Sequence, residues 1–217
     1  MKLGRGETLV ICSQRQVGKS LTCSQLLLYV ALNYDRSKSF YISPTNDSSR
    51  KFFNDMKEML EGTQLVTKVN ESLLIIEFIN GSSIYFRSAE SKLRGYSCRN
   101  GGILVVDEAQ YLPDDIWKVI LPFTNVENSR KVIISTPGLK TTMFWKFYQS
   151  ALLKEPGFHL ISTKDYDTSM FLSDEQREAY KKMLTPQDYR SEILGEWLDV
   201  SEGLFGDYQS VLKEPTD

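Results

Sequence analysis

The residues best suited to chemistry in this chain begin at positions 13–20, which read Ser-Gln-Arg-Gln-Val-Gly-Lys-Ser. They follow the phosphate-loop pattern G-x-x-x-x-G-K-[ST], except that Ser13 stands where the first Gly usually sits. In such a loop the backbone N–H groups of residues 17–20 point at phosphate oxygens from a helix N-terminus. Lys19 would bridge the β- and γ-phosphates, and the Ser20 hydroxyl would ligate Mg²⁺. The candidate nucleotide-binding residues are therefore Ser13, Gln14, Arg15, Gln16, Val17, Gly18, Lys19 and Ser20.

A second motif supplies carboxylates. Residues 103–106 are the apolar run Ile-Leu-Val-Val, and Asp107 and Glu108 follow it directly. Four apolar residues that end in two acids indicate a buried parallel strand with carboxylates at its C-terminal tip. Asp107 would support the Mg²⁺ shell, and Glu108 would polarise an attacking water. The alternative is an acidic helix start after a core strand, but the two motifs in this order favour a nucleotide site.

Composition narrows the class of protein. The 217 residues suffice for one α/β domain with a core, or for one domain with a small appendage. The formal net charge of −2 provides no global basic field, so any contact with nucleic acid must be local. The three cysteines lack C-x-x-C spacing, which argues against a disulfide framework or a zinc site and fits a reducing cytosol. No apolar run approaches a membrane span, and the single histidine argues against His-based catalysis.

Alternating strand and helix patterns surround both motifs. An apolar strand at 9–12 precedes the loop, a helix over 19–34 follows it, and Asn80-Gly81 predicts a hairpin turn. The other expected elements are a strand at 39–42, a helix from 46 or 47 to 60, hairpin strands within 73–87, strands at 103–106, 131–135 and 158–163, a helix at about 113–121, and helices that begin near Asp174 and Pro186. This alternation predicts an α/β fold with a doubly wound, mainly parallel sheet, and such sheets bind ligands at the C-terminal ends of their strands.

Three classes of P-loop NTPase have a fold of this kind. A GTPase would carry D-x-x-G at the second motif, where Asp107 is followed by Glu-Ala-Gln, and its guanine-reading carboxylate would fall on Tyr166. A small-molecule kinase needs no water-activating Glu beside the metal-binding Asp. Mechanical ATPases of the ASCE (RecA-like) type insert a strand between the loop strand and the Asp-Glu strand. A polar residue at the C-terminal tip of this inserted strand senses the γ-phosphate, and Thr136 fits that position.

The motifs together resemble those of bacteriophage terminase large subunits. Residues 15–20, Arg-Gln-Val-Gly-Lys-Ser, are similar to the family's variant Walker A, in which Arg-Gln precedes Gly-Lys-Ser. Four further matches follow in family order: the hairpin at 80–88, the Leu-Arg-Gly signature at 93–96, the coupling motif at 133–137 and the closing segment of the ATPase domain at 189–197. The resemblance spans about residues 7–205, and five motifs in order are specific.

The resemblance implies the ATPase of a viral double-stranded DNA packaging motor, with ATP and Mg²⁺ as cofactors. Asp107 and Ser20 would support the metal, Glu108 would activate water, and Thr136 would couple hydrolysis to movement. Two arginines are candidates for a catalytic finger. Arg15 would act in cis within the loop, and Arg94 would act in trans across a ring interface, unless Arg94 is simply a solvated turn residue.

The resemblance also implies partners and a setting. The partners are double-stranded DNA, a portal protein, a small terminase subunit and further copies of the chain in a homo-oligomeric ring, a pentamer on the procapsid. The location is the host cytoplasm, transiently at the procapsid, with no membrane. We expect an ATPase domain at 1–197 and a linker stub at 198–217 toward an absent nuclease domain, and hence no nuclease activity in this chain. A domain of a longer protein and a naturally separate subunit both fit this pattern.

Two other functions stay open from the sequence. One is a helicase-like DNA-dependent ATPase, and the other is a nucleotide-gated assembly module with little turnover. DNA-stimulated hydrolysis would separate these alternatives from each other. The candidates to line a DNA channel, each of which alone is more typical of a solvated surface charge, are Arg50, Lys51, Lys57, Lys92, Arg99 and Lys140.

Overall fold

The computed structural model describes residues 6–125, 129–163 and 172–199. Tyr166 and the predicted linker stub from residue 200 onward lie outside the described residues. The strands are β1 (Thr8–Cys12), β2 (Lys38–Ser43), β3 (Val66–Asn70), β4 (Ile75–Phe78), β5 (Ser83–Ser88), β6 (Ile103–Val106), β7 (Arg130–Ser135) and β8 (Phe158–Ser162). The helices are α1 (Lys19–Asn33), α2 (Asn46–Met59), α3 (Asp114–Ile120), α4 (Met143–Leu152), α5 (Asp174–Met183) and α6 (Pro186–Asp188). Three shorter turns are η1 (Ala109–Tyr111), η2 (Leu121–Thr124) and the π-helical η4 (Tyr189–Ile193).

The described strands form one sheet in the order β3-β4-β5-β2-β6-β7-β1-β8. The strands from β5 to β8 in this order pair in parallel, and β4 and β3 extend the edge in antiparallel fashion. β7 lies between β1, which leads into the phosphate loop, and β6, which ends beside Asp107. This inserted strand confirms the predicted ASCE-type, mainly parallel fold and places Thr136 between the two motifs.

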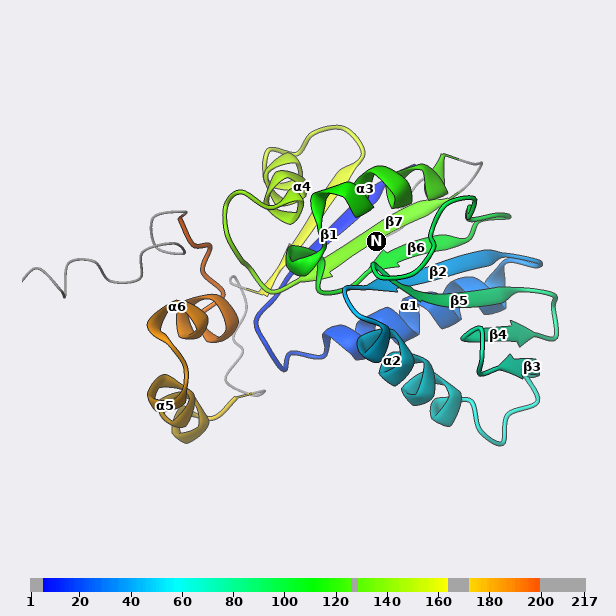
Figure 1. Ribbon diagram of the computed structural model, residues 1–217, viewed down its shortest axis with the longest axis horizontal. Helices are drawn as coiled ribbons and strands as arrows, with labels where there is room; N and C mark the ends of the chain where they lie inside the picture. The colour runs from blue at the N-terminus through cyan, green and yellow to red at the C-terminus, as the bar shows by residue number, and fades with distance from the viewer. Residues whose placement is uncertain (1–5, 126–128, 164–171, 200–217) are drawn as a thin grey trace, which may run out of the picture.

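The sheet separates two cores, because successive side chains of a strand point to opposite faces. Leu9 and Ile11 of β1 pack with α1 and α2, whereas Val10 and Cys12 of the same strand pack with α3 and α4. The chain therefore covers both faces of the sheet with helices, as a doubly wound fold requires (Figure 1). Burial on both sides explains why the central strands read as continuous apolar runs in the sequence.

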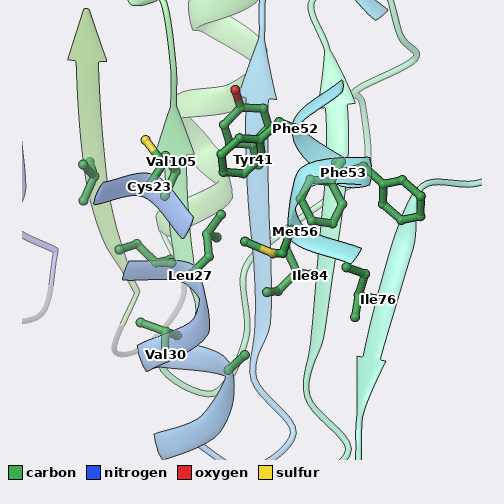
Figure 2. Close-up of a cluster of buried hydrophobic side chains, with 14 of the residues drawn as sticks. Cys23, Leu27, Val30, Tyr41, Phe52, Phe53, Met56, Ile76, Ile84 and Val105 are labelled. Atoms are coloured by element: carbon green, nitrogen blue, oxygen red, sulfur yellow. The ribbon is translucent and has the colours of Figure 1, made fainter. Parts of the chain in front are cut away.

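Tyr41 links the core of one face to the ligand-binding edge. Its ring stacks on Phe52 of α2, with the ring centroids 4.0 Å apart and an interplanar angle of 9°. In Figure 2 this pair lies beside Cys23 of α1, and the Tyr41 hydroxyl points along β2 toward the C-terminal end of the strand. A single aromatic side chain thus contributes apolar surface to the core and a polar tip to the edge where both motifs end.

The elements follow the prediction with two differences. The sequence pattern does not predict β3, whose residues form a mostly exposed edge strand. The helix expected near Pro186 continues only to Asp188 and passes into the π-helical turn η4. In Figure 1, α5 and α6 lie beyond the end of the sheet that carries the phosphate loop. No helix in the described part of the chain is long and apolar enough to cross a membrane.

Candidate active site

The phosphate loop, residues 13–18, joins β1 to α1. Gly18 precedes the helix with φ 86°, in the left-handed region that favours glycine. Two backbone N–H groups anchor the loop to neighbouring strands. The Ser13 N–H donates to the Ser135 carbonyl at 3.0 Å, and the Gln14 N–H donates to the Thr163 hydroxyl at 3.1 Å. The loop is therefore fixed against β7 and the end of β8.

Serine is compatible with the first position of the loop. Ser13 is not among the described residues with positive φ, so this position does not require a glycine backbone. The side chain is only 3% exposed and lies where β1 ends. The departure from the phosphate-loop pattern at Ser13 is therefore accommodated without backbone strain.

Lys19 lies over the loop at the start of α1. Its ammonium group donates to the Gln14 carbonyl at 2.8 Å and reaches the Ser13 carbonyl at 3.5 Å. Burial lowers the pKa of Lys19, against an opposing effect of the nearby Glu192, Asp107 and Glu108 carboxylates. The lysine is thus a partly desolvated cation that gains most from an anionic ligand.

Asp107 is the buried carboxylate of the site. Its Oδ2 accepts a hydrogen bond from the Tyr41 hydroxyl, and its Oδ1 accepts one from the Glu108 N–H, both at 2.8 Å. Burial raises the pKa of Asp107, and these two hydrogen bonds and the charge of Lys19 oppose that rise. The side chain is therefore held in one orientation by a tyrosine from the neighbouring strand.

We expect Tyr41→Phe to lower the free energy of unfolding by about 1–3 kcal/mol, because the buried Asp107 carboxylate loses a donor. Tyr29→Phe is the matched control, since Tyr29 is 61% exposed on α1. Denaturant titration of the two variants measures the difference. Equal unfolding midpoints for both variants would show that the Tyr41 hydroxyl does not stabilise Asp107.

Glu108 occupies a strained position. Its backbone lies in the left-handed region, with φ 48° and ψ 42°, immediately before the turn η1. Such a conformation costs a non-glycine residue about 1–3 kcal/mol and is common at functional sites. Burial raises the pKa of Glu108, and the charges of Asp107 and Glu192 raise it further. With this backbone, Glu108 lines the same cavity as Lys19 and Ser20 of the phosphate-loop motif.

Thr136 follows β7 and lies between the two motifs. Its hydroxyl accepts a hydrogen bond from the Gln110 amide at 2.7 Å and donates one to the Glu192 carboxylate at 3.2 Å. Gln110 belongs to the turn after Glu108, so Thr136 is connected to the Asp-Glu motif and to the C-terminal segment. Thr136 therefore joins the end of β7 to both of these parts of the site.

A cavity of about 510 Å³ unites most of the predicted residues. This volume is within the range of small-molecule sites. The predicted residues that line it are Arg15, Gln16, Gly18, Lys19, Ser20, Glu108 and Thr136. Four residues that the sequence motifs do not include line it as well: Leu21, Lys51, Tyr111 and Glu192.

Other predicted residues lie elsewhere. Ser13, Gln14, Val17 and Asp107 do not line the cavity. Arg94 is exposed in a turn and is also absent from the lining, so one chain does not bring it to its own phosphate loop.

Three of the candidate DNA-binding lysines have acidic neighbours on the surface. Lys51 faces Asp55, Lys57 contacts Glu71, and Lys140 pairs with Asp199. These pairings agree with the interpretation of each as a solvated surface charge.

The oxygen atoms available at this site suit Mg²⁺ better than a metal ion held entirely by protein side chains. Within the described residues no group of three or more His, Cys, Asp or Glu side chains is placed to hold a metal ion. Mg²⁺ commonly binds through one or two protein oxygens together with substrate phosphates and water. Asp107 and the exposed Ser20 hydroxyl, at the end of β6 and the start of α1, offer that type of site.

Comparison with known proteins gives independent evidence about the family of this chain. A family model described as terminase large subunit, T4likevirus-type, N-terminal, matches residues 11–208. A comparison with curated proteins finds no match. Among solved structures, the ATPase domain of the Thermus phage P74-26 large terminase is similar with 21% sequence identity and a TM-score of 0.71, over 89% of each chain.

Two longer relatives show the same fold. The large terminase of a thermophilic bacteriophage, solved in complex with ATP-gamma-S, has 18% identity and a TM-score of 0.71, and that of bacteriophage HK97 has 17% and 0.72. Each match covers 88% of this chain, but only 48% of the thermophilic phage protein and 47% of the HK97 protein. The chain thus spans about half the length of these two proteins.

Proposed function

Because this chain belongs to the terminase large subunit family, T4likevirus-type, we propose that it is the ATPase of a viral DNA-packaging motor. In this role it hydrolyses ATP and couples hydrolysis to the translocation of double-stranded DNA into a procapsid. The observation that carries the proposal is the convergence of Lys19, Glu108 and Thr136 on one cavity at the C-terminal edge of the parallel sheet. The thermophilic phage relative, solved in complex with ATP-gamma-S, supports ATP as the nucleotide.

Binding of the triphosphate is assigned to the loop. The N–H groups at the start of α1 and the Lys19 ammonium together present positive charge to phosphate oxygens. Lys19 would exchange the carbonyl acceptors of Ser13 and Gln14 for these oxygens. When bound with the nucleotide, Mg²⁺ neutralises charge on the β- and γ-phosphates, and Ser20 and Asp107 are the residues that would hold it.

The chemical step is assigned to Glu108 and the coupling to Thr136. An ionised Glu108 accepts a hydrogen bond from the attacking water and orients it toward the γ-phosphate. Thr136 contacts both the turn after Glu108 and the C-terminal segment, so a change at the γ-phosphate can reach both. Arg15 lines the cavity and is the arginine that can act in cis, whereas Arg94 does not line it and would act on a nucleotide bound by a neighbouring copy.

We expect Lys19→Ala to weaken ATP binding by roughly 30- to 4,000-fold, because truncation of one partner of a desolvated charge pair typically costs about 2–5 kcal/mol. Isothermal titration with Mg²⁺ and ATP-gamma-S measures the change. Lys146→Ala is the control, since Lys146 is exposed on α4, away from the cavity. Unchanged affinity in Lys19→Ala would remove the phosphate-loop assignment.

The assembly that we propose is a homo-oligomeric ring, a pentamer on the procapsid, with double-stranded DNA, a portal protein and a small terminase subunit as partners. We place it in the host cytoplasm, transiently at the procapsid. The proposed division of labour gives residues 1–197 to the ATPase domain and residues 198–217 to a linker. Because the assembled ring completes each site, the isolated chain should be a slow ATPase.

A DNA-dependence assay tests the proposed function against its rivals. ATP turnover is measured for the chain alone, with double-stranded DNA, and with DNA and procapsids that carry the portal. A packaging ATPase is stimulated most in the third mixture and protects the DNA from added nuclease. Stimulation by DNA alone, with no effect of procapsids, would favour the helicase-like ATPase. Tight nucleotide binding with negligible turnover in every mixture would favour an assembly module.

A further inference from the structure

Glu192 brings an additional carboxylate to the cavity proposed for phosphates. It belongs to the π-helical turn η4 and lines the cavity together with Lys19 and Glu108. Its Oε1 accepts hydrogen bonds from the Tyr111 hydroxyl at 3.0 Å and the Thr136 hydroxyl at 3.2 Å. Glu192 and a γ-phosphate would therefore be two anions that compete for the same hydroxyl group.

The charge of Glu192 acts on the whole cavity. For three neighbours of Glu192, burial has the largest effect on the pKa: it lowers the pKa of Lys19 and raises those of Glu108 and Tyr111. The charge of Glu192 raises all three pKa values. Like charges repel strongly in a site partly shielded from water. A γ-phosphate that enters the cavity is thus opposed while the Glu192 carboxylate remains on Thr136.

The segment that carries Glu192 is tied to the phosphate loop. The Arg15 N–H donates to the Glu192 carbonyl at 2.8 Å, so the loop holds the turn η4 directly. A π-helical turn is rare and frequently marks a functional position. Movement of Glu192 would therefore act on the phosphate loop through the hydrogen bond between the Arg15 N–H and the Glu192 carbonyl.

The same segment runs beside the residues after Thr136. The Ser191 hydroxyl donates to the Pro137 carbonyl, and the Leu198 N–H donates to the Gly138 carbonyl at 2.9 Å. Trp197 then packs on Trp145 of α4, with ring centroids 4.8 Å apart. Residues 189–199 are therefore seated along the stretch that begins at Thr136, with Glu192 at the end nearest the nucleotide.

We propose that Glu192 is a positioning residue that makes the C-terminal segment 189–199 sensitive to the γ-phosphate. The position of its carboxylate depends on whether a γ-phosphate is bound, and the packing of the segment depends on that position. The inference rests on the proposed function, since it takes ATP as the ligand. With ADP in the cavity, Glu192 remains on Thr136 and the segment stays seated. With ATP, the γ-phosphate displaces the carboxylate and loosens the segment. Hydrolysis and phosphate release return it, so each turnover moves residues 189–199 once out and once back.

The first test compares affinities for Mg²⁺-ATP-gamma-S and Mg²⁺-ADP by isothermal titration. Glu192→Gln keeps the size of the side chain and removes its charge. We expect the affinity for ATP-gamma-S relative to ADP to rise roughly tenfold or more. Glu196→Gln is the matched control, because it removes the same charge from the same segment at a residue paired with Arg190 and absent from the cavity. An unchanged affinity ratio in Glu192→Gln would overturn the proposal.

The second test uses the unaltered chain and so does not depend on a variant folding. Hydrogen exchange is followed at the Arg15, Glu196 and Leu198 amides, whose hydrogen bonds fix the segment. ATP-gamma-S should accelerate exchange at these amides relative to ADP and leave the Val105 amide of β6 unchanged. Equal exchange with both nucleotides would contradict the inference. Failure of the unaltered chain to bind either nucleotide would instead contradict the proposed function, so the two failures are distinguishable.

Discussion

Glu108→Gln is expected to bind ATP with Mg²⁺ as the unaltered chain does and to lose turnover by roughly 10²–10⁴-fold, the usual contribution of a general acid or base. The substitution removes the carboxylate that would accept a hydrogen bond from water. It leaves Asp107, Lys19 and the phosphate loop in place. Glutamine has nearly the same shape, so the strained backbone at this position is unchanged.

Two measurements separate this result from a general loss of structure. Titration with Mg²⁺-ATP-gamma-S should give the affinity of the unaltered chain, and single-turnover hydrolysis should be slow. Glu58→Gln, at an exposed position on α2, should hydrolyse ATP normally. If Glu108→Gln turns over near the rate of the unaltered chain, the carboxylate that activates water lies elsewhere, and Glu192 is then the first candidate because it lines the same cavity.

The strands at the centre of the fold could be predicted because both of their faces are buried. β6 and β7 read as apolar runs since every residue from 103 to 106 and from 132 to 135 is buried. β3 could not be predicted on this basis. It is an edge strand whose residues are exposed or half-buried, and its pairing with β4 depends on backbone hydrogen bonds that leave little trace in residue type.

The sequence motifs predicted where the cavity lies, but they did not predict all of the residues that line it. The phosphate loop and the Asp-Glu strand have fixed spacing, so their meeting at one edge of the sheet follows from topology alone. Glu192 is nearly a whole domain away from the phosphate loop in sequence, and the π-helical turn breaks the regular helical spacing that would reveal its direction. The packing of the last segment against the phosphate loop and the residues from Thr136 onward brings Glu192 to the cavity.

The contact of Tyr41 with Asp107 could not be predicted from the sequence, for a different reason. Within the run Phe-Tyr-Ile of β2 it reads as one more core residue, and its ring is indeed buried. Its second role follows from register, because Tyr41 pairs with Val105 of β6, two residues before Asp107. The alternation of side chains then puts the tyrosine and the aspartate on the same face. A polar tip on a core side chain becomes visible only once neighbouring strands are aligned.

Arg94→Ala is expected to fold and bind ATP normally and to lose hydrolysis in the assembled motor by roughly 10³–10⁵-fold, the usual effect of an arginine finger. Arg94 is exposed and does not line the cavity of its own chain, so the expected effect would come through a neighbour. The isolated chain should show no difference between Arg94→Ala and the unaltered protein. Turnover is compared in the presence and absence of DNA and procapsids.

Arg94→Lys separates a finger from a simple surface charge. Lysine keeps the positive charge but lacks the planar fork that binds two phosphate oxygens at once. A finger should therefore remain defective as Arg94→Lys, whereas a solvated turn residue or a nonspecific DNA contact should tolerate the change. Full packaging-dependent turnover in either variant would leave Arg15 as the better candidate.

Mixing Arg94→Ala with Glu108→Gln tests the trans arrangement directly. Each variant lacks a different half of a composite site, so neither hydrolyses ATP alone. In a mixed ring, some nucleotides are bound by a subunit that retains Glu108 and face a neighbour that retains Arg94. Those interfaces are complete, and part of the turnover should return in proportion to their number. A mixture as inactive as its two components would contradict the trans role.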